Sequence, residues 1–222
     1  MIESSFWDYS HSLVGEELKS LPLPHLVLPK IQDLIKNLSK SLNSDYFELL
    51  DGVFVHKSAK VSKNAYVFSP CIIGAETEVR PSAYIRGNAV IGDNCVIGNS
   101  CEVKNSIIFD GAQIPHFNYV GDSVVGYKAH LGAGVILSNV KSDKTPVRYS
   151  WRGEVIYTNL KKVGSFLADG VEVGCNSVLN PGTVIGKNAT IYPLSSVRGE
   201  VKPYHVYKNE KNIIEKYEQK SN

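Results

Sequence analysis

The sequence has 222 residues, of which 43% are hydrophobic and 21% charged, enough for one or two compact domains with a buried core. The formal net charge of +2 comes from interspersed signs, and the chain lacks the polybasic stripe that nucleic acids or anionic membranes require. Its apolar runs are far shorter than the roughly 20 residues of a membrane span, and residues 1–5 are polar where a signal peptide would be basic and then apolar. We therefore expect a cytoplasmic protein whose ligands are small molecules.

Residues 1–50 precede the main pattern of the chain, and we interpret them as a helical N-terminal cap. Binding of their amphipathic segment, residues 29–42, to a membrane or a partner protein is the alternative. Apolar side chains recur there at the spacing of one helix face, namely Ile31, Leu34, Ile35, Leu38 and Leu42.

A six-residue period runs through the chain from residue 51 onward. Val or Ile stands at every sixth position from 55 to 103, and a small residue such as Ala59, Cys71 or Thr77 follows four positions after each of the first eight. In such hexapeptide repeats three short strands make one triangular coil, because the β-branched residue fills the interior of a face and only a small side chain fits at a corner. The period predicts a left-handed parallel β-helix over residues 51–202.

The four cysteines show no CxxC spacing. Cys71, Cys95 and Cys101 occupy the small position of the repeat, so we expect them to point inward as plain small residues, without disulfides or metal.

An insertion at residues 139–162 interrupts the period. Before it, the core positions continue to Leu137, and two of the intervals between them are five residues instead of six. After it, the six-residue period resumes from Leu167 to Val197. Residues 147–151 and 154–158 flank Arg152 and Gly153. This pattern predicts a β-hairpin that projects from the coil. Long excursions from a rigid scaffold are more often functional than accidental.

The charged tail, residues 203–222, contains Ile213, Ile214 and Tyr217, which predict a short C-terminal helix. An open β-helix end exposes unpaired strand edges, so we expect helical caps at both ends of the coil.

Two cations are expected to stack on neighbouring coils. Three hexads make one coil, so residues 18 apart lie about 4.8 Å apart. Arg86 and Lys104 have this separation, and each follows a core residue and so points outward. Such cations repel unless an anion lies between them, which favours a phosphate-binding pair. Two solvated cations on an exposed face are the alternative.

Two histidines are candidates for one cleft. His116 lies close to a corner, and the next coil places Ala133, between Gly132 and Gly134, above it, which leaves room for a ligand. His130 lies on that neighbouring coil, and the rise per residue along a strand predicts that it lies within roughly 10 Å of His116. A structural role is the alternative for a lone histidine.

These residues resemble the acetyltransferase half of the bifunctional glucosamine-1-phosphate acetyltransferase/N-acetylglucosamine-1-phosphate uridyltransferase, including its archaeal sugar-1-phosphate relatives. The resemblance covers about residues 80–200. Hexapeptide repeats alone indicate an acyltransferase-like protein, whereas this set of motifs is typical of a sugar-1-phosphate site. The motifs are Arg86, Gly98-Asn99, Glu102-x-Lys104 and a His-x-x-Tyr-x-Gly-Asp run over residues 116–122.

The resemblance implies N-acetylation of an amino-sugar 1-phosphate, glucosamine 1-phosphate foremost, with acetyl-CoA as cosubstrate and no metal, in nucleotide-sugar synthesis of the UDP-N-acetylglucosamine type. It assigns the general base to His116, because the amine loses a proton as it attacks the thioester and an imidazole ordinarily titrates at about 6.5. It implies that Arg86 and Lys104 bind the phosphate of the sugar. It also implies that a backbone N–H within residues 132–134 stabilises the oxyanion of the tetrahedral intermediate. The other implied contacts are Tyr119, His130 and Asn139 for the sugar, and Ala133, Cys175 and Pro193 for acetyl-CoA.

The chain also departs from the family pattern. His130 replaces an asparagine, Cys175 a serine and Pro193 an alanine. No Gly-rich nucleotide loop is present, and about 50 residues before the coil cannot hold a nucleotidyltransferase domain, so we do not expect uridylyl transfer by this chain. We expect a homotrimer with clefts between subunits, and a separate nucleotidyltransferase as a candidate partner.

Two other functions compete with acetyl transfer. A non-catalytic module that binds sugar phosphates or nucleotide sugars, related to a UDP-N-acetylglucosamine pyrophosphorylase, would tolerate the changes at Cys175 and Pro193. A zinc hydratase of the γ-carbonic anhydrase type shares the coil, but His116 and His130 supply only two candidate ligands.

Overall fold

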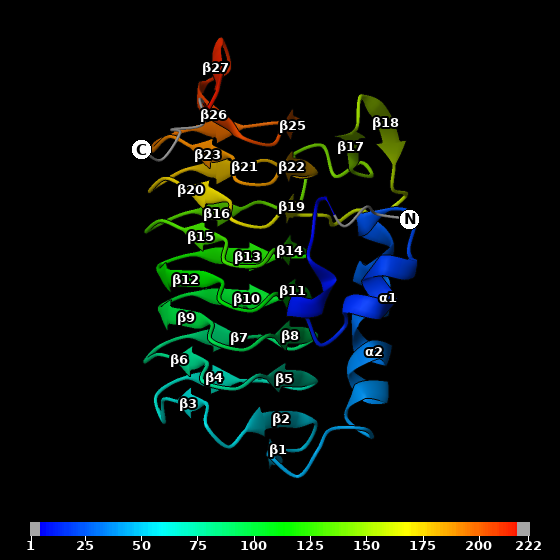
Figure 1. Cartoon of the computed structure of the whole chain (residues 1–222), viewed down its shortest axis with the longest axis vertical. Coiled ribbons are helices and arrows are strands. Elements are labelled where there is room, and N and C mark those ends of the chain that lie inside the picture. Colours follow the sequence, from blue (N-terminus) through cyan, green and yellow to red (C-terminus); the bar gives the residue numbers. More distant parts are fainter. Residues whose placement is uncertain (1–4, 217–222) are drawn as a thin grey trace, which may run out of the picture.

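The computed structural model describes residues 5–216 and confirms a mainly β, left-handed parallel β-helix (Figure 1). Its strands stack into three faces, called A, B and C in the order in which the chain visits them. The strands of face A are β1 (Tyr46–Leu50), β2 (Val53–His56), β5 (Cys71–Ile73), β8 (Ala89–Ile91), β11 (Ser106–Ile108), β14 (Val124–Val125), β19 (Ser165–Leu167), β22 (Thr183–Ile185) and β25 (Glu200–Val201).

Faces B and C complete the triangle, and each pair of faces meets at a corner named after them. Face B contains β3 (Lys60–Val61), β6 (Glu78–Val79), β9 (Val96–Asn99), β12 (Gln113–His116), β15 (His130–Leu131), β20 (Glu172–Val173), β23 (Thr190–Ile191), β26 (His205–Asn209) and β27 (Asn212–Glu215). Face C contains β4 (Tyr66–Val67), β7 (Tyr84–Ile85), β10 (Glu102–Lys104), β13 (Tyr119–Gly121), β16 (Ile136–Leu137), β21 (Val178–Leu179) and β24 (Ser196–Val197).

The interior of the coil follows the six-residue period. Ile73, Ile85, Ile97 and Val103 are fully buried, as their positions predict. Cys71, Cys95 and Cys101 are also buried and unpaired, which confirms them as small inward residues. Burial raises the pKa of the Cys71 and Cys95 thiols to about 12, so these thiols are chemically inert at neutral pH.

The N-terminal segment lies along face A and not over the end of the coil. Its helices are α1 (Gly15–Ser20) and α2 (Ile31–Leu38), with 3₁₀ turns at Tyr9–His11 and Pro24–Lys30. Figure 1 shows them running beside the face A strands, from about the level of β19 down toward β2, with β22 and β25 above them. The helix predicted within residues 29–42 exists as α2, but the expectation that it caps the coil end is wrong. The first coil ends instead in β1, which pairs antiparallel with β2.

Face A needs this cover because its outward side chains are apolar. Trp7 of the N-terminal segment is fully buried, lies 5.8 Å from the Phe109 ring and donates from Nε1 to the Leu167 carbonyl at 2.7 Å. The outward residues of face A that are buried or half-buried include Phe54, Ile72, Val90, Ile107, Val124, Phe166 and Val184.

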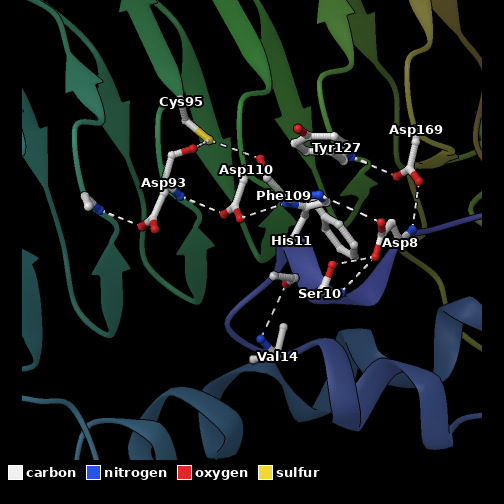
Figure 2. A network of polar contacts seen from close by, with 12 residues as sticks. Asp8, Ser10, His11, Val14, Asp93, Cys95, Phe109, Asp110, Tyr127 and Asp169 are labelled. Atoms are coloured by element: carbon white, nitrogen blue, oxygen red, sulfur yellow. Dashed lines mark hydrogen bonds and ion pairs between the residues drawn. The ribbon is translucent and has the colours of Figure 1, made fainter.

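Polar contacts at the A–B corner fix the same segment (Figure 2). Asp169 accepts from the backbone N–H of Asp8 at 2.7 Å and of Tyr127 at 3.0 Å. His11 stacks on the Tyr127 ring with centroids 3.6 Å apart, and its Nδ1 lies 3.6 Å from Asp110 Oδ2. The segment is thus joined to the coil by both apolar packing and hydrogen bonds.

The insertion contains the predicted hairpin, with β17 (Arg148–Trp151) antiparallel to β18 (Glu154–Tyr157). It packs against the N-terminal segment, because the Trp151 ring lies 5.0 Å from that of Phe6 and the Tyr149 hydroxyl lies 3.0 Å from His25 Nδ1. The hairpin therefore extends the cover of face A in its own subunit.

The predicted C-terminal helix is wrong within the described residues. Ile213 and Ile214 lie in β27, which pairs antiparallel with β26, while Tyr217 lies outside the described residues. The last coil offers an open strand edge, and an isolated helix shorter than about 12 residues is only marginally stable in water. Pairing with that edge therefore prevails over the weak helical pattern. No helix within residues 5–216 is long and apolar enough to span a membrane.

Candidate functional site

Four of the predicted site residues form one column at the B–C corner. His116, Ala133, Cys175 and Pro193 each follow a core residue by two positions on successive coils. Backbone hydrogen bonds join these coils, with the carbonyls of His116, Ala133 and Cys175 accepting at 3.0, 2.8 and 2.9 Å from the coil above. The structure thus places the predicted base beside the residues expected to line the donor groove.

His116 ends β12 on the surface of this corner, beside the exposed Phe117. Its main chain is held by the buried Asn118, whose Oδ1 accepts from the His116 N–H at 3.0 Å and whose Nδ2 donates to the Gly132 carbonyl at 2.7 Å. Within residues 5–216 the imidazole itself has no hydrogen-bonding partner. It is therefore available to a ligand.

Some backbone N–H groups at this corner, those of Ala133 and Cys175 among them, have no hydrogen-bond acceptor within residues 5–216. The N–H groups of Gly132 and Gly134 donate to the carbonyls of Val173 and His116, at 2.7 and 3.0 Å. The Ala133 N–H donates to no carbonyl within the described part of the chain. Of the three candidates for stabilising an oxyanion, Ala133 is thus the one with a free hydrogen.

His130 does not join His116. It begins β15 on face B, in register with Gln113 and Glu172, and its Nδ1 lies 2.8 Å from Glu172 Oε2. His116 stands at the opposite end of the neighbouring strand. His130 therefore contacts Glu172 on face B and lies away from the B–C corner.

Arg86 and Lys104 do stack on face C, but each already has a carboxylate partner. Arg86 Nη1 lies 2.8 Å from Glu102 Oε1, and this contact raises the pKa of the arginine. Lys104 Nζ lies 2.9 Å from Asp122 Oδ2. The first pair is substantially exposed, whereas the side chain of Asp122 is only 6% exposed, so the two cations differ in how freely they can exchange partners.

The Asp122 carboxylate is the shared acceptor for several polar side chains at the C–A corner. Besides Lys104, it accepts from Asn105 Nδ2 at 2.8 Å and from Asn139 Nδ2 at 2.5 Å. Asn139 Nδ2 also donates to the Tyr119 hydroxyl at 3.1 Å, and burial raises the pKa of that phenol. Lys104, Tyr119 and Asn139, predicted separately as ligands, thus lie in one network at the end of face C.

Sequence reasoning did not assign roles to Asn118, Glu102 or Asp122. Asn118 carries a detectable signal, since it stands four positions after Ile114, where the repeat otherwise places a small inward residue. Glu102 and Asp122 lie inside the recognised motifs, but their pairing with Arg86 and Lys104 depends on side-chain directions. Within residues 5–216 no group of three His, Cys, Asp or Glu side chains gathers as a metal-binding cluster.

Comparisons with known proteins confirm the sequence resemblance. Residues 67–159 match the family described as the GMPPB C-terminal domain. The chain is 34% identical over 157 residues to the bifunctional sugar-1-phosphate nucleotidylyltransferase/acetyltransferase of Sulfurisphaera tokodaii, covering 71% of this chain and 39% of that protein. It is 32% identical over 185 residues to the bifunctional protein GlmU of Methanococcus aeolicus, covering 75% of this chain and 45% of that protein. The chain thus spans less than half the length of these relatives.

Among solved structures, the acetyltransferase domain of PglB from Neisseria gonorrhoeae in complex with acetyl coenzyme A is similar at a TM-score of 0.37 and 12% identity. The alignment covers 85% of this chain and 66% of that domain.

Proposed function

On the premise that this chain is related to bifunctional sugar-1-phosphate nucleotidylyltransferase/acetyltransferases, we propose that it transfers an acetyl group from acetyl-CoA to the amine of an amino-sugar 1-phosphate. Glucosamine 1-phosphate is the leading acceptor. The observation that supports the proposal most is the B–C column, in which an unpartnered imidazole at His116 lies one coil from a free backbone N–H at Ala133.

The reaction needs one base and one oxyanion donor at this corner. His116 takes a proton as the amine nitrogen attacks the thioester carbon, and the Ala133 N–H stabilises the negative oxygen of the tetrahedral intermediate. The C–S bond then breaks, and the imidazolium returns the proton to the departing thiolate. Asn118 positions both groups, because it joins the main chain of His116 to that of Gly132.

The acceptor lies along face C, with its amine toward His116 and its phosphate toward Arg86 and Lys104. Tyr119 begins the strand between these two ends, and Asn139 reaches its hydroxyl, so both contact the sugar. To bind there, the phosphate must replace Glu102 as the partner of Arg86 and Asp122 as the partner of Lys104, or bind each cation together with its carboxylate. The exposed Arg86 does this at lower cost, because surface ion pairs contribute only about 0–1 kcal/mol.

The donor lies along the B–C column past Ala133, Cys175 and Pro193. As parts of the same proposal, the chain acts in the cytoplasm as a homotrimer, with a separate nucleotidyltransferase as a candidate partner in nucleotide-sugar synthesis. His130, which lies away from the B–C corner, contacts an acceptor held by a second subunit in this proposal, since its Glu172 partner is exposed and replaceable.

The test is thiol release from acetyl-CoA by the purified chain, followed with a panel of amino-sugar 1-phosphates and, as matched controls, the same sugars without phosphate. We expect release with at least one phosphorylated acceptor and little with its unphosphorylated form. Absence of release with every acceptor would contradict acetyl transfer. Retention of sugar-phosphate binding in that case would favour the non-catalytic module.

Cys175 provides a second test of the donor column. It is the exposed cysteine, whereas Cys71, Cys95 and Cys101 are buried. A thiol reagent should modify one cysteine quickly in the native protein and four after unfolding, and Cys175→Ser should abolish the fast phase. Coenzyme A should slow this phase several-fold. An unchanged rate at saturating coenzyme A would place the donor elsewhere.

A further inference from the structure

A groove beside the insertion lies past the C–A corner on the last coils of face C. It consists of two hollows, of about 310 and 380 Å³, that share Lys141, Pro181 and Arg198 as a common wall. The first hollow extends toward Asn180, and the second toward Arg148 at the start of β17. None of these residues belongs to the acetyl-transfer site proposed above.

The groove has an excess of positive charge. Three cations line it, Lys141, Arg148 and Arg198, against the single carboxylate of Asp143, which gives a net charge of +2. Lys141 Nζ lies 3.3 Å from Asp143 Oδ2. Across the part of the chain that the structure describes, neither Arg148 nor Arg198 forms an ion pair. This differs from Arg86 and Lys104, each of which is already paired with a carboxylate.

The walls of the groove are held in place. Arg198 Nη2 donates to Asn180 Oδ1 at 3.2 Å, and Asn180 Nδ2 donates in turn to Ser196 Oγ and the Val197 carbonyl, at 3.1 and 2.9 Å. Asp143, which lines the first hollow, accepts at Oδ1 from the Thr145 N–H at 3.0 Å. A cation held by a neutral amide keeps its full charge for a ligand, and its orientation costs the ligand little entropy.

We propose that this groove binds a diphosphate ester. The diphosphate carries about two negative charges, which match the net charge of the groove, and lies against Arg198 on the shared wall. The two organic groups of the ester extend into the two hollows, toward Asn180 and toward Arg148. The inference does not depend on acetyl transfer. The same chemistry occurs in coenzyme A and in nucleotide diphosphates.

Calorimetric titration with inorganic pyrophosphate at low ionic strength tests the proposal. We expect saturable binding by the wild-type chain, weakened at least about tenfold in Arg198→Gln and in Arg148→Gln. The matched control is Arg80→Gln on face B, where the arginine is paired with Glu78, and it should bind like wild type. A thermal melt of each variant verifies that it is folded.

Titrations with coenzyme A and UDP identify the source of the diphosphate. For UDP, binding that is tighter than that of pyrophosphate and lost in Arg198→Gln supports the groove and names its ligand. Coenzyme A is also expected at the B–C column, so it is assigned to the groove only if it binds at two sites per chain and Arg198→Gln removes one of them. The proposal is overturned if pyrophosphate does not bind, or if Arg80→Gln weakens binding as much as Arg198→Gln does. Because pyrophosphate carries no acetyl group, these outcomes are independent of the catalytic assay.

Discussion

Charged side chains line both the A–B corner and the C–A corner, and the two corners use them differently. At the A–B corner, Asp93, Asp110 and Asp169 accept backbone N–H groups from neighbouring coils or from the N-terminal segment (Figure 2). At the C–A corner, the Asp122 carboxylate accepts only side-chain donors within residues 5–216, among them Lys104 and Asn139. Backbone donors cannot leave without unfolding the coil, whereas side-chain donors can turn to a ligand. The comparison distinguishes a structural corner from the corner that we propose binds the acceptor, called the binding corner below.

The largest expected effect concerns the N-terminal segment, which the structural corner holds against face A. Trp7→Ala removes a fully buried indole between the N-terminal segment and face A, and we expect the free energy of unfolding to fall by about 3–5 kcal/mol. Urea unfolding measures the loss. Phe117→Ala, which removes an exposed aromatic ring, should change stability by no more than about 0.5 kcal/mol. Similar small losses for both variants would mean that the N-terminal segment does not cover face A.

An intermediate effect is expected at the binding corner. Asp122→Asn removes the charge that pairs with Lys104 while keeping the shape of the side chain, and it should lower the free energy of unfolding by about 1–3 kcal/mol. Glu102→Gln breaks the exposed pair with Arg86 and should cost at most about 1 kcal/mol. Equal decreases in the free energy of unfolding for the two variants would contradict the difference in burial between the Lys104 and Arg86 ion pairs.

A smaller, pH-dependent effect is expected from Asp110. Burial raises the pKa of its carboxyl from the ordinary 3.8, so the folded state binds this proton more tightly than the unfolded chain does. Wild-type stability relative to Asp110→Asn should therefore decrease as the pH rises from about 3.8 through the higher folded pKa, and stay constant above it. Urea unfolding from pH 3.5 to 7 measures this difference. A difference that increases with pH would contradict a raised pKa.

The repeat made much of the fold predictable, because one β-branched residue in six must fill the interior of the coil. The same arithmetic placed Ala133 over His116. It did not locate the cover of face A, although the apolar outward residues Ile72, Val90 and Ile107 carried that signal. Apolar side chains on the outside of one face require a covering segment, so this feature was available in the sequence and was overlooked.

Other features depend on three-dimensional contacts that spacing does not determine. The 18-residue rule points from Lys104 to Asp122, but a step of five shortens this coil to 17 residues, so Lys104 is in register with Gly121. The ion pair forms because the Asp122 side chain turns back from the corner to Lys104, and residue spacing does not determine that direction. The strand at Ile213 and Ile214 forms because a coil edge is available to it, which a local helical pattern does not reveal. The separation of His130 from His116, in contrast, was available from the spacing, because His130 precedes its core residue by one position and His116 follows its core residue by two.

The most direct test of the central claim is the acetyl-transfer rate of His116→Ala with the best acceptor. We expect kcat/KM to fall by about 10²–10⁴ while the melting temperature stays unchanged, because the proposal gives the exposed imidazole a role in catalysis and none in the fold. His205→Ala, which removes an imidazole in β26, should retain wild-type activity. Full activity in His116→Ala would contradict the account.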